Sequence, residues 1–411
     1  MLKKLFILII ILSSIALYNF KFLGDFSKIM ELTGIGLILL LIIIYGIYDD
    51  SFRFRHHFSP FIAIIFISLP FSMYIADRFH NQSMSLTLYA QKGIYFYLFY
   101  FVLHQMKVKP RDFEKLFIVL GLVFVLFYMT QFLLYPKVVL FNARITHERG
   151  TIRIFLAGME YLIIGYFLTL KNFLDKQQIK YAVLLITFLS IVILIGSRTL
   201  LFTVLAATVL NFMLSKRIRS RFLIYFLSVA GVILVYFAFQ KIIEELINTA
   251  VYKDPISSQN IRVKAVKYFL ARLFPNGLAY IFGNGASTGH SEYSNTVGMI
   301  SLKYGYYLGD IGLIGEYIKY GSIFILGVLG LLIKVFITKI RTEHNYIKYF
   351  FVFTVMAMIL GGGFSDSGFV AIVCILLYII DVSNFSLSNS KTKTVSSDTP
   401  GSLQTINPDP E

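Results

Sequence analysis

The sequence is poor in cysteine and in charged residues. Only one of its 411 residues is cysteine, Cys374, so the chain can form no intrachain disulfide and no cysteine zinc cluster. Charged residues make up 15% of the chain, whereas a soluble domain has about a quarter. Apolar and aromatic residues make up 57%, and the mean hydropathy is +0.73. These proportions exclude a soluble enzyme, a secreted disulfide scaffold and a disordered chain, and they predict a multi-pass membrane protein.

The motifs of common cofactor sites are also absent. The sequence contains no Walker or dinucleotide glycine loop, and the spacing of its His, Asp and Glu residues matches no zinc pattern. We therefore expect no metal and no cofactor. At the N-terminus, Lys3 and Lys4 precede an apolar stretch, as in a signal peptide, but no small-x-small cleavage site follows. We expect this segment to be a first helix that stays in the protein.

Long apolar runs recur along the chain. A helix needs about 20 mostly apolar residues to cross a bilayer, and runs that are continuous rather than alternating exclude transmembrane β-strands. We predict an all-α polytopic membrane protein with about 12 transmembrane helices. The predicted spans are residues 5–20, 32–48, 58–76, 87–105, 113–135, 154–170, 180–197, 199–214, 222–240, 311–333, 346–362 and 367–381.

Basic residues predict which way these helices face. Twelve helices place both termini on one side, and the positive-inside rule assigns that side to the cytoplasm because every short connection there is then basic. The cytoplasmic cations are Lys3, Lys4, Arg53, Arg55, Lys107, Lys109, Arg111, Lys115, Lys171, Lys176, Lys180, Lys216, Arg217, Arg219, Arg221, Lys334, Lys339, Arg341 and Lys348. Topology thus explains most of the +16 net charge, and we expect no nucleic acid partner.

The spans divide the chain into four regions. Residues 1–240 hold transmembrane helices 1 to 9, and residues 241–310 form one large extracytoplasmic loop. Residues 311–383 hold helices 10 to 12, and the polar residues 384–411 form a disordered cytoplasmic tail.

An amphipathic helix on the membrane surface is expected in the large loop, at residues 260–274. Its apolar stripe consists of Val263, Val266, Phe269, Leu270, Leu273 and Phe274. Arg262 falls within this stripe. Either the helix starts later, or Arg262 points inward towards the bundle.

Several cations face outward in this topology, and topology does not explain them. They are Arg144, Arg149, Arg153, Arg198, Arg262, Lys264, Lys267 and Arg272. Arg198 lies in a tight turn between two apolar spans, where a cation is costly unless it snorkels, pairs or meets a ligand. It either snorkels at the interface or binds phosphate, since a planar guanidinium suits bidentate contact with phosphate oxygens.

Arg149 and Arg153 precede the sixth span. If that span begins as a helix here, the two cations share one face and repel each other unless an anion lies between them. Glu160 is then about two turns into the membrane, where a carboxylate is usually paired, and Arg153 or Arg198 is its expected partner.

Two further side chains are candidates for proton transfer. His290 lies in the large loop, but nothing in the sequence fixes its geometry. Asp310 opens span ten, where it either caps the helix or deprotonates an attacking hydroxyl. The outer turn 361–366 lies beside the same site or is only a flexible hairpin.

Together these features resemble the O-antigen and exopolysaccharide repeat-unit polymerases (Wzy-type) of the O-antigen polymerase–ligase superfamily. The resemblance covers about residues 110–370. Its motifs are Glu-Arg-Gly-Thr-Ile-Arg at 148–153, Gly-Ser-Arg-Thr at 196–199, Ile-Arg at 261–262, Gly-Asn-Gly at 283–285 and Gly-Asp-Ile-Gly-Leu-Ile-Gly at 309–315. The Arg-x15-Gly and Arg-x10-Gly signatures of some members are matched by the pairs Arg149/Gly165 and Arg272/Gly283. Ser301 stands where the ligase branch has glycine after a histidine, which favours a polymerase over a ligase.

The resemblance implies a glycosyltransferase in the cytoplasmic (inner) membrane. Its substrate is an undecaprenyl-diphosphate-linked oligosaccharide at the outer face, and its partners are membrane lipids and a flippase and chain-length regulator of the same pathway. Arg198, with Arg149, Arg153 or Arg262, is expected to hold the diphosphate, and Asp310 or His290 to assist the attacking hydroxyl. A flippase for the same lipid is the alternative from another class. Its support comes from the ionisable or polar residues His104, Gln131 and Glu160 within spans.

Overall fold

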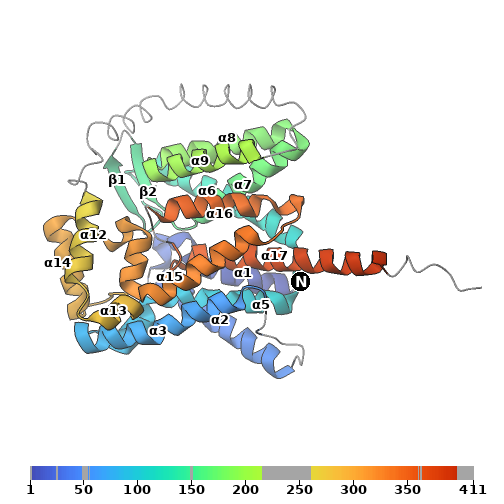
Figure 1. Ribbon diagram of the computed structural model, residues 1–411. Helices are drawn as coiled ribbons and strands as arrows, with labels where there is room; N and C mark the ends of the chain where they lie inside the picture. Colours follow the sequence, from blue (N-terminus) through green and yellow to red (C-terminus); the bar gives the residue numbers. More distant parts are fainter. Residues whose placement is uncertain are drawn as a thin grey trace, which may run out of the picture.

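The computed structural model describes residues 2–24, 26–48, 54, 56–148, 151–214, 261–359, 361 and 363–395. Most of this chain is helical (Figure 1). The α-helices are α1 Leu2–Ser14, α2 Phe26–Tyr48, α3 Ser59–His80, α4 Met84–Ala90, α5 Phe99–Met106, α6 Pro110–Leu134, α7 Met159–Lys176, α8 Ile179–Leu194, α9 Arg198–Leu214, α12 Ile261–Arg272, α13 Gly277–Phe282, α14 Glu292–Tyr304, α15 Leu313–Ile337, α16 Tyr346–Met358 and α17 Ser367–Val395. The shorter elements are the 3-10 helices η1 Ala16–Asn19, η2 Lys21–Leu23, η3 Lys92–Leu98, η5 Leu308–Ile311 and η6 Thr342–His344, and the strands β1 Arg144–Glu148 and β2 Thr151–Phe155.

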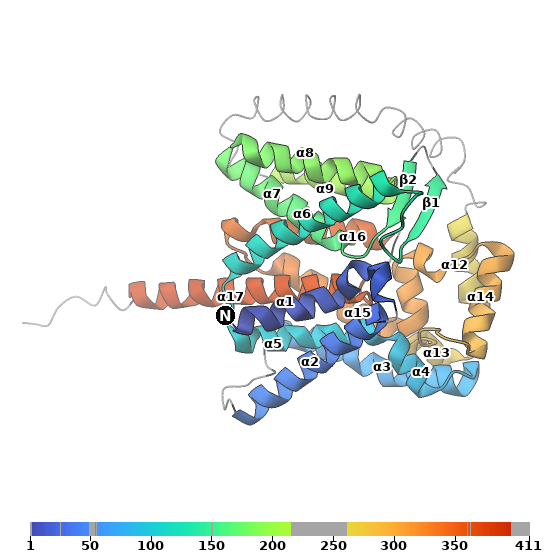
Figure 2. The same ribbon diagram turned by 180° about the vertical axis from the view of Figure 1, so that it is seen from behind.

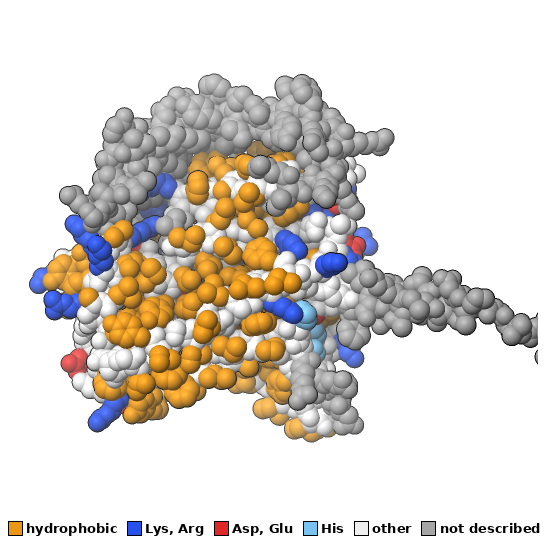
Figure 3. Space-filling model, viewed as in Figure 1, with side chains coloured by type: hydrophobic (Ala, Val, Ile, Leu, Met, Phe, Trp, Pro, Cys, Tyr) orange, Lys and Arg blue, Asp and Glu red, His pale blue; other side chains and the backbone are white. Residues whose placement is uncertain are grey.

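Five of the described helices are long and apolar enough to cross a membrane: α2, α3, α6, α15 and α17. Helices α8, α9 and α16 are shorter apolar helices. On the face seen in Figure 3, apolar side chains cover the middle of the molecule, and most Lys and Arg side chains lie towards its two ends. The protein is therefore a mainly helical, multi-pass membrane protein by composition and shape. The number of twelve crossings stays a prediction, and the predicted span 222–240 lies outside the described residues.

The two ends of the described chain lie on one side of the molecule. The start of α1 and the C-terminal end of α17 are at one end of the bundle, and the β-hairpin, α12 and α14 are at the other (Figures 1 and 2). This arrangement separates the predicted outer loops from the predicted cytoplasmic ends. Which end faces the cytoplasm stays a prediction.

Residues 144–148 and 151–155 form two paired strands, so the condition under which Arg149 and Arg153 would share a helix face, a span that begins here, is not met. Strands β1 and β2 pair antiparallel, with Thr146 opposite Arg153. Polar and β-branched residues alternate in both strands, a pattern that favours a half-buried hairpin over a helix. Arg153 therefore does not share a helix face with Arg149, which lies outside the described residues. Helix α7 starts only at Met159.

The predicted span 87–105 is interrupted rather than continuous. Helix α4 ends at Ala90, and the chain continues as η3 before α5 begins at Phe99. Gly93 lies in this interruption, where a Cβ atom would overlap the backbone oxygen of Ser365. The close approach of these two segments requires glycine at this position, and it brings Lys92 beside the loop that precedes α17.

The large loop packs partly on protein instead of lying free on a membrane surface. Phe269 of α12 and Leu273, which directly follows that helix, are buried in a small core shared with Tyr293 of α14 and Ile311 of η5. The apolar face expected to rest on lipid thus covers other parts of the loop. Residues 241–260 of the predicted loop lie outside the described residues.

Helix α17 continues to Val395, past residue 384, where the sequence predicts the start of a disordered tail. Once a helix is nucleated, each further residue adds one backbone hydrogen bond, so the helix of an apolar span can extend past its apolar part. Residues 396–411 lie outside the described chain.

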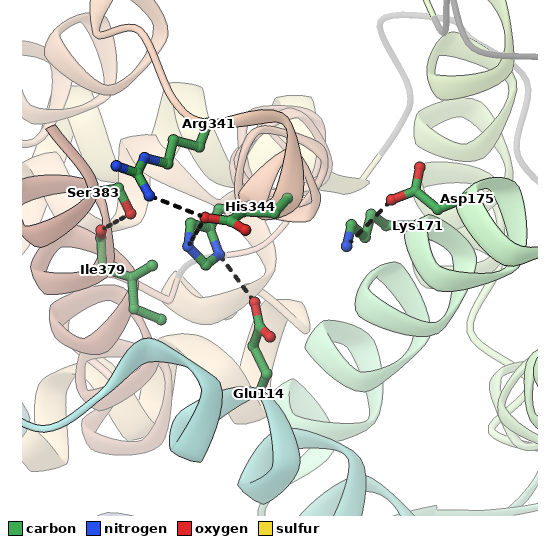
Figure 4. Close-up of polar contacts among 8 residues, drawn as sticks. Glu114, Lys171, Asp175, Arg341, His344, Ile379 and Ser383 are labelled. Carbon is green, nitrogen blue, oxygen red and sulfur yellow. Dashed lines mark hydrogen bonds and ion pairs between the residues drawn. The ribbon is translucent and has the colours of Figure 1, made fainter. Parts of the chain in front are cut away.

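At the end that holds the start of α1, charged side chains tie helices together (Figure 4). His344 Nδ1 lies 2.9 Å from Glu114 Oε1, which links η6 to α6. Lys171 and Asp175 pair along α7 at 3.3 Å. The contact of His344 with Glu114 fixes the connection between α15 and α16 on the side opposite the hairpin.

A kink in α15 is held by the Gly283–Gly285 turn. Gly321 has φ 78° and ψ −178°, which breaks the helix and frees the carbonyls before it. The Ile318 oxygen accepts from the Asn284 amide at 2.9 Å, and the Lys319 oxygen accepts from the Gly285 amide at 2.8 Å. Gly283 itself has φ +80°, and a Cβ there would overlap the Lys319 backbone. The turn that follows α13 therefore holds the N-terminal half of α15 in place.

We expect Gly283→Ala to destabilise the protein by about 2 kcal/mol or more, because the substitution forces a glycine-only conformation and a backbone clash. Gly277→Ala is the matched control, since a Cβ there meets nothing within 4 Å. The buried thiol of Cys374 gives the readout: a thiol-reactive fluorogenic dye labels it only on unfolding. Equal melting temperatures for the two variants would contradict the role given to Gly283.

Candidate functional site

A cavity of about 1560 Å³ opens at the end of the bundle that carries the hairpin. The hairpin, the start of α9, the described start of α12 and the segments before α7, α15 and α17 all contribute to its wall. Six basic and five acidic side chains line it. They are Lys92, Arg144, Arg153, Arg198, Arg262 and Lys319, and Glu31, Glu160, Asp310, Glu316 and Asp366.

Four of the predicted site residues meet in this cavity, although they lie far apart in the sequence. Arg153, Arg198 and Arg262 are half-buried in its wall, and Asp310 is exposed to it. His290 is exposed and does not line the cavity, so the structure does not bring it to this site.

One face of the β-hairpin forms part of the basic wall. Register and strand alternation put Arg144, Thr146, Arg153 and Phe155 on the same face, and all four line the cavity. The guanidinium of Arg153 lies 4.9 Å from the centre of the Phe155 ring. Its Nε donates to the Ile195 oxygen at 3.4 Å. The hairpin is thereby tied to the turn that precedes α9.

Arg198 is the first residue of α9 and follows a turn in which Gly196 has φ +65°. The Ser197 hydroxyl caps this helix by accepting from the Leu200 amide at 3.4 Å. The N-terminal end of a helix carries a partial positive charge, which disfavours a cation and favours an anion. Arg198 and the helix end thus add to one positive potential at the cavity wall. This is a suitable surface for phosphate groups.

Arg262 points towards the bundle, which decides between the two alternatives left by the sequence. Helix α12 already includes Arg262, so the helix does not start later. Arg262 is half-buried and lines the cavity, whereas Lys264 and Lys267 on the same helix are exposed.

The acidic side of the cavity is organised by the loop 365–367, which leads into α17 and ends at its first residue. The Ser365 hydroxyl donates to Glu316 Oε1 at 3.0 Å. The hydroxyl of Ser367 is 2.9 Å from Glu31 Oε1 and 2.6 Å from the Ser14 backbone oxygen. Glu31 also pairs with Lys92, which η3 brings to the same place. This loop therefore joins α2 and α15 through their carboxylates and contacts the end of α1.

Asp366, at the centre of this loop, caps α17. Its Oδ1 accepts from the backbone amides of Gly368 at 3.1 Å and Phe369 at 3.2 Å. The carboxyl is open to the cavity yet has protein on most sides, and this burial raises its pKa by disfavouring the charged form. The two amide bonds oppose that shift, and Glu31 and Glu316 add to it by repulsion.

Glu160 lies in the first turn of α7 and lines the cavity, and its depth in the membrane stays a prediction. A Cβ on Gly368 would overlap Glu160 Oε1, so this carboxylate rests against the start of α17. The amide of Gly368 in turn bonds Asp366. Glu160 and Asp366 are therefore held on either side of one glycine.

Asp310 does not cap α15, so that alternative is wrong. The residue before α15 is Gly312, and no side chain bonds the helix end. Asp310 lies in η5 instead, exposed to the cavity. Its carboxylate thus remains available to a ligand.

Sequence reasoning missed the ion pairs on the acidic side. Lys92, Glu316 and Lys319 lie within predicted spans, where an ionisable residue marks a functional site by default. The ionisable residues within apolar spans were therefore visible in the sequence, but their positions do not predict that Lys92 pairs with a glutamate in another helix. Among the described residues, no group of three or more His, Cys, Asp or Glu side chains has the arrangement of a metal site.

No protein-family model and no curated protein matches this chain. The interpretation of the cavity therefore depends on its own geometry and charge.

We expect a cysteine introduced at position 310 to react with a water-soluble maleimide, because Asp310 is exposed to the cavity. Wild-type protein is the control, since its only thiol, Cys374, is fully buried. Labelling of intact cells would place the cavity at the outer face. An Asp310→Cys variant that stays unlabelled in native, solubilised protein would show that water does not reach this wall.

Proposed function

We propose that this protein polymerises undecaprenyl-diphosphate-linked oligosaccharide repeat units into a surface polysaccharide by glycosyl transfer at the outer face of the cytoplasmic membrane. The observation that carries the proposal is the cavity itself. It has an arginine-rich wall suited to a diphosphate and carboxylates suited to sugar hydroxyls, at one end of a membrane protein. The resemblance of the sequence to repeat-unit polymerases supports the same reaction.

The donor's diphosphate would bind the wall formed by Arg153, Arg198 and Arg262. Each guanidinium can donate two parallel hydrogen bonds to phosphate oxygens. The polyprenyl chain needs an apolar surface that continues from this wall. Phe202 of α9 provides one, since it lines the cavity and is 67% exposed. Leu205 and Val209 extend the same exposed side of α9.

In the proposed reaction, a hydroxyl of one glycan attacks the anomeric carbon of the lipid-linked glycan. A new C–O bond forms there as the C–O bond to the diphosphate breaks. Asp310 takes the proton from the attacking hydroxyl, as a general base. The arginines stabilise the negative charge that develops on the departing lipid diphosphate.

A flippase for the same lipid is the second candidate. The sequence supports a flippase through polar residues within the predicted spans, and the structure weakens that support. Gln131 bonds the backbone of the segment after α6, donating to the Val138 oxygen at 3.0 Å and accepting from the Leu140 amide at 2.7 Å. This is a structural role at a helix end. A ligase would use the same donor site, and the acceptor it takes would distinguish it.

We expect Arg198→Ala to reduce polymer formation by about 100-fold or more, because removing one donor to a developing anion has effects of that size. The assay incubates purified protein with the lipid-diphosphate repeat unit and resolves the products as a glycan ladder. Arg272→Ala is the matched control, because Arg272 is an exposed arginine that does not line the cavity. Full polymerase activity of Arg198→Ala would contradict the assignment of the donor site. Lipid movement across liposomes without any ladder would identify a flippase.

Asp310→Asn should lower the turnover rate by about 100-fold or more while leaving donor binding unchanged, because the amide cannot accept the proton. His290→Ala should keep wild-type turnover, since the imidazole lies away from the cavity. Single-turnover rates at saturating donor separate the two variants. The opposite result, with His290 essential and Asp310 dispensable, would reject the base assigned here.

A further inference from the structure

The carboxylate and lysine pairs around the loop 365–367 have no part in holding the donor. We propose that this group of side chains is a binding subsite for the hydroxyl groups of the acceptor glycan, a neutral sugar chain. The subsite, named here the 365–367 subsite, consists of Ser365, Asp366, Glu31, Lys92, Glu316 and Lys319. The inference rests on the proposed glycosyl transfer and adds where its second substrate binds.

Glu316 gives the most specific indication of a missing ligand. Its side chain is 4% exposed and lines the cavity. Oε1 accepts from Ser365 and lies 3.5 Å from Lys319 Nζ, but Oε2 has no hydrogen-bond partner among the described residues. A buried carboxylate oxygen without a partner is costly, so such an atom calls for a donor that the protein itself does not supply. A ligand hydroxyl in the cavity would meet this need once the Glu316 side chain turns Oε2, which is buried in the wall, towards the cavity.

The subsite carries charges of both signs, with Asp366 as one carboxylate in excess of the two lysines, and this mixture favours a ligand rich in hydroxyl groups over an ion. Glu31 has its own partner in Lys92, and Glu316 has its own in Lys319. The carboxylates would repel a phosphate, and the lysines would repel a metal ion. Sugar hydroxyls both donate and accept, so they match a surface where carboxylate acceptors alternate with ammonium donors.

The subsite is pre-organised by backbone contacts that do not depend on a ligand. The close approach of Gly93 to Ser365 fixes Lys92 beside the loop. Ser367 anchors the other side of the loop to the Ser14 backbone. Rigid placement lowers the entropy lost on binding, which is what a site for a flexible glycan needs.

The same geometry connects the subsite to the proposed base. Helix α15 begins two residues after η5, and a Cβ on Gly315 would overlap the Leu308 oxygen. Asp310 and Glu316 therefore lie on two elements in direct contact. A glycan whose hydroxyls bind Glu316 would therefore lie in the same cavity as Asp310 and the arginines.

The test compares binding of two probes to purified protein in nanodiscs by titration calorimetry. One probe is the oligosaccharide released by mild acid from the host cell's own lipid-linked repeat unit, and the other is undecaprenyl diphosphate. We expect Glu316→Gln to weaken oligosaccharide binding by about 10-fold or more, the usual effect of losing a charge-assisted hydrogen bond. It should leave undecaprenyl diphosphate binding within about 2-fold of wild type. Arg198→Ala should weaken undecaprenyl diphosphate binding and leave oligosaccharide binding within about 2-fold of wild type.

The outcomes separate the two proposals. Wild-type oligosaccharide affinity in Glu316→Gln, with lipid binding intact, overturns the acceptor subsite alone. Undecaprenyl diphosphate that binds Arg198→Ala as tightly as wild type overturns the donor site instead. If Glu316→Gln no longer binds either probe, the Ser365→Ala variant is the deciding measurement. It removes one hydroxyl and leaves the charges of Glu316 and Lys319 in place. Weakened oligosaccharide binding in Ser365→Ala supports the subsite, and unchanged binding rejects it.

Discussion

The cavity depends on one constraint, the set of hydrogen bonds made by three consecutive residues at the start of α17, two just before the helix and its first residue. Ser365 reaches the carboxylate of Glu316 in α15, and Ser367 reaches that of Glu31 in α2 together with the backbone end of α1. Between them, Asp366 caps α17. Buried polar groups must be paired, so these bonds hold four helices at fixed distances around a polar space that apolar packing alone would close.

The two walls of the cavity differ in how their charges are compensated. On the acidic side, Glu31 and Glu316 each have a lysine close by. On the basic side, Arg198 stands at the N-terminal end of α9, where the helix adds positive potential. Because Glu31 and Glu316 have lysines of their own, these two carboxylates cancel less of the positive field that an incoming anion meets. The cavity thus keeps its anion-binding arginines apart from the side that carries the paired carboxylates and lysines.

The sequence predicts the helices well, because a bilayer span requires a long apolar run that is easy to recognise. Each predicted span except 222–240 overlaps a described helix. The common location of Arg198, Arg262 and Asp310 also follows from topology, since all three were expected at the same face. The hairpin was missed because two arginines four residues apart were interpreted as a helix face. Alternation of Arg144, Thr146 and Arg153 with isoleucines was the better signal.

The sequence does not predict a contact between two residues that no motif links. Lys92 meets Glu31 only because Gly93 lets one backbone approach another, and the sequence shows the glycine but not its neighbour. The same holds for Glu160, which rests against Gly368. In both places the absence of a glycine side chain leaves space for another group, the Ser365 backbone oxygen at Gly93 and the Glu160 carboxylate at Gly368. Polar sites inside an apolar bundle therefore depend on small residues as much as on the charges themselves, since a methyl group at either glycine would displace the partner that the cavity requires.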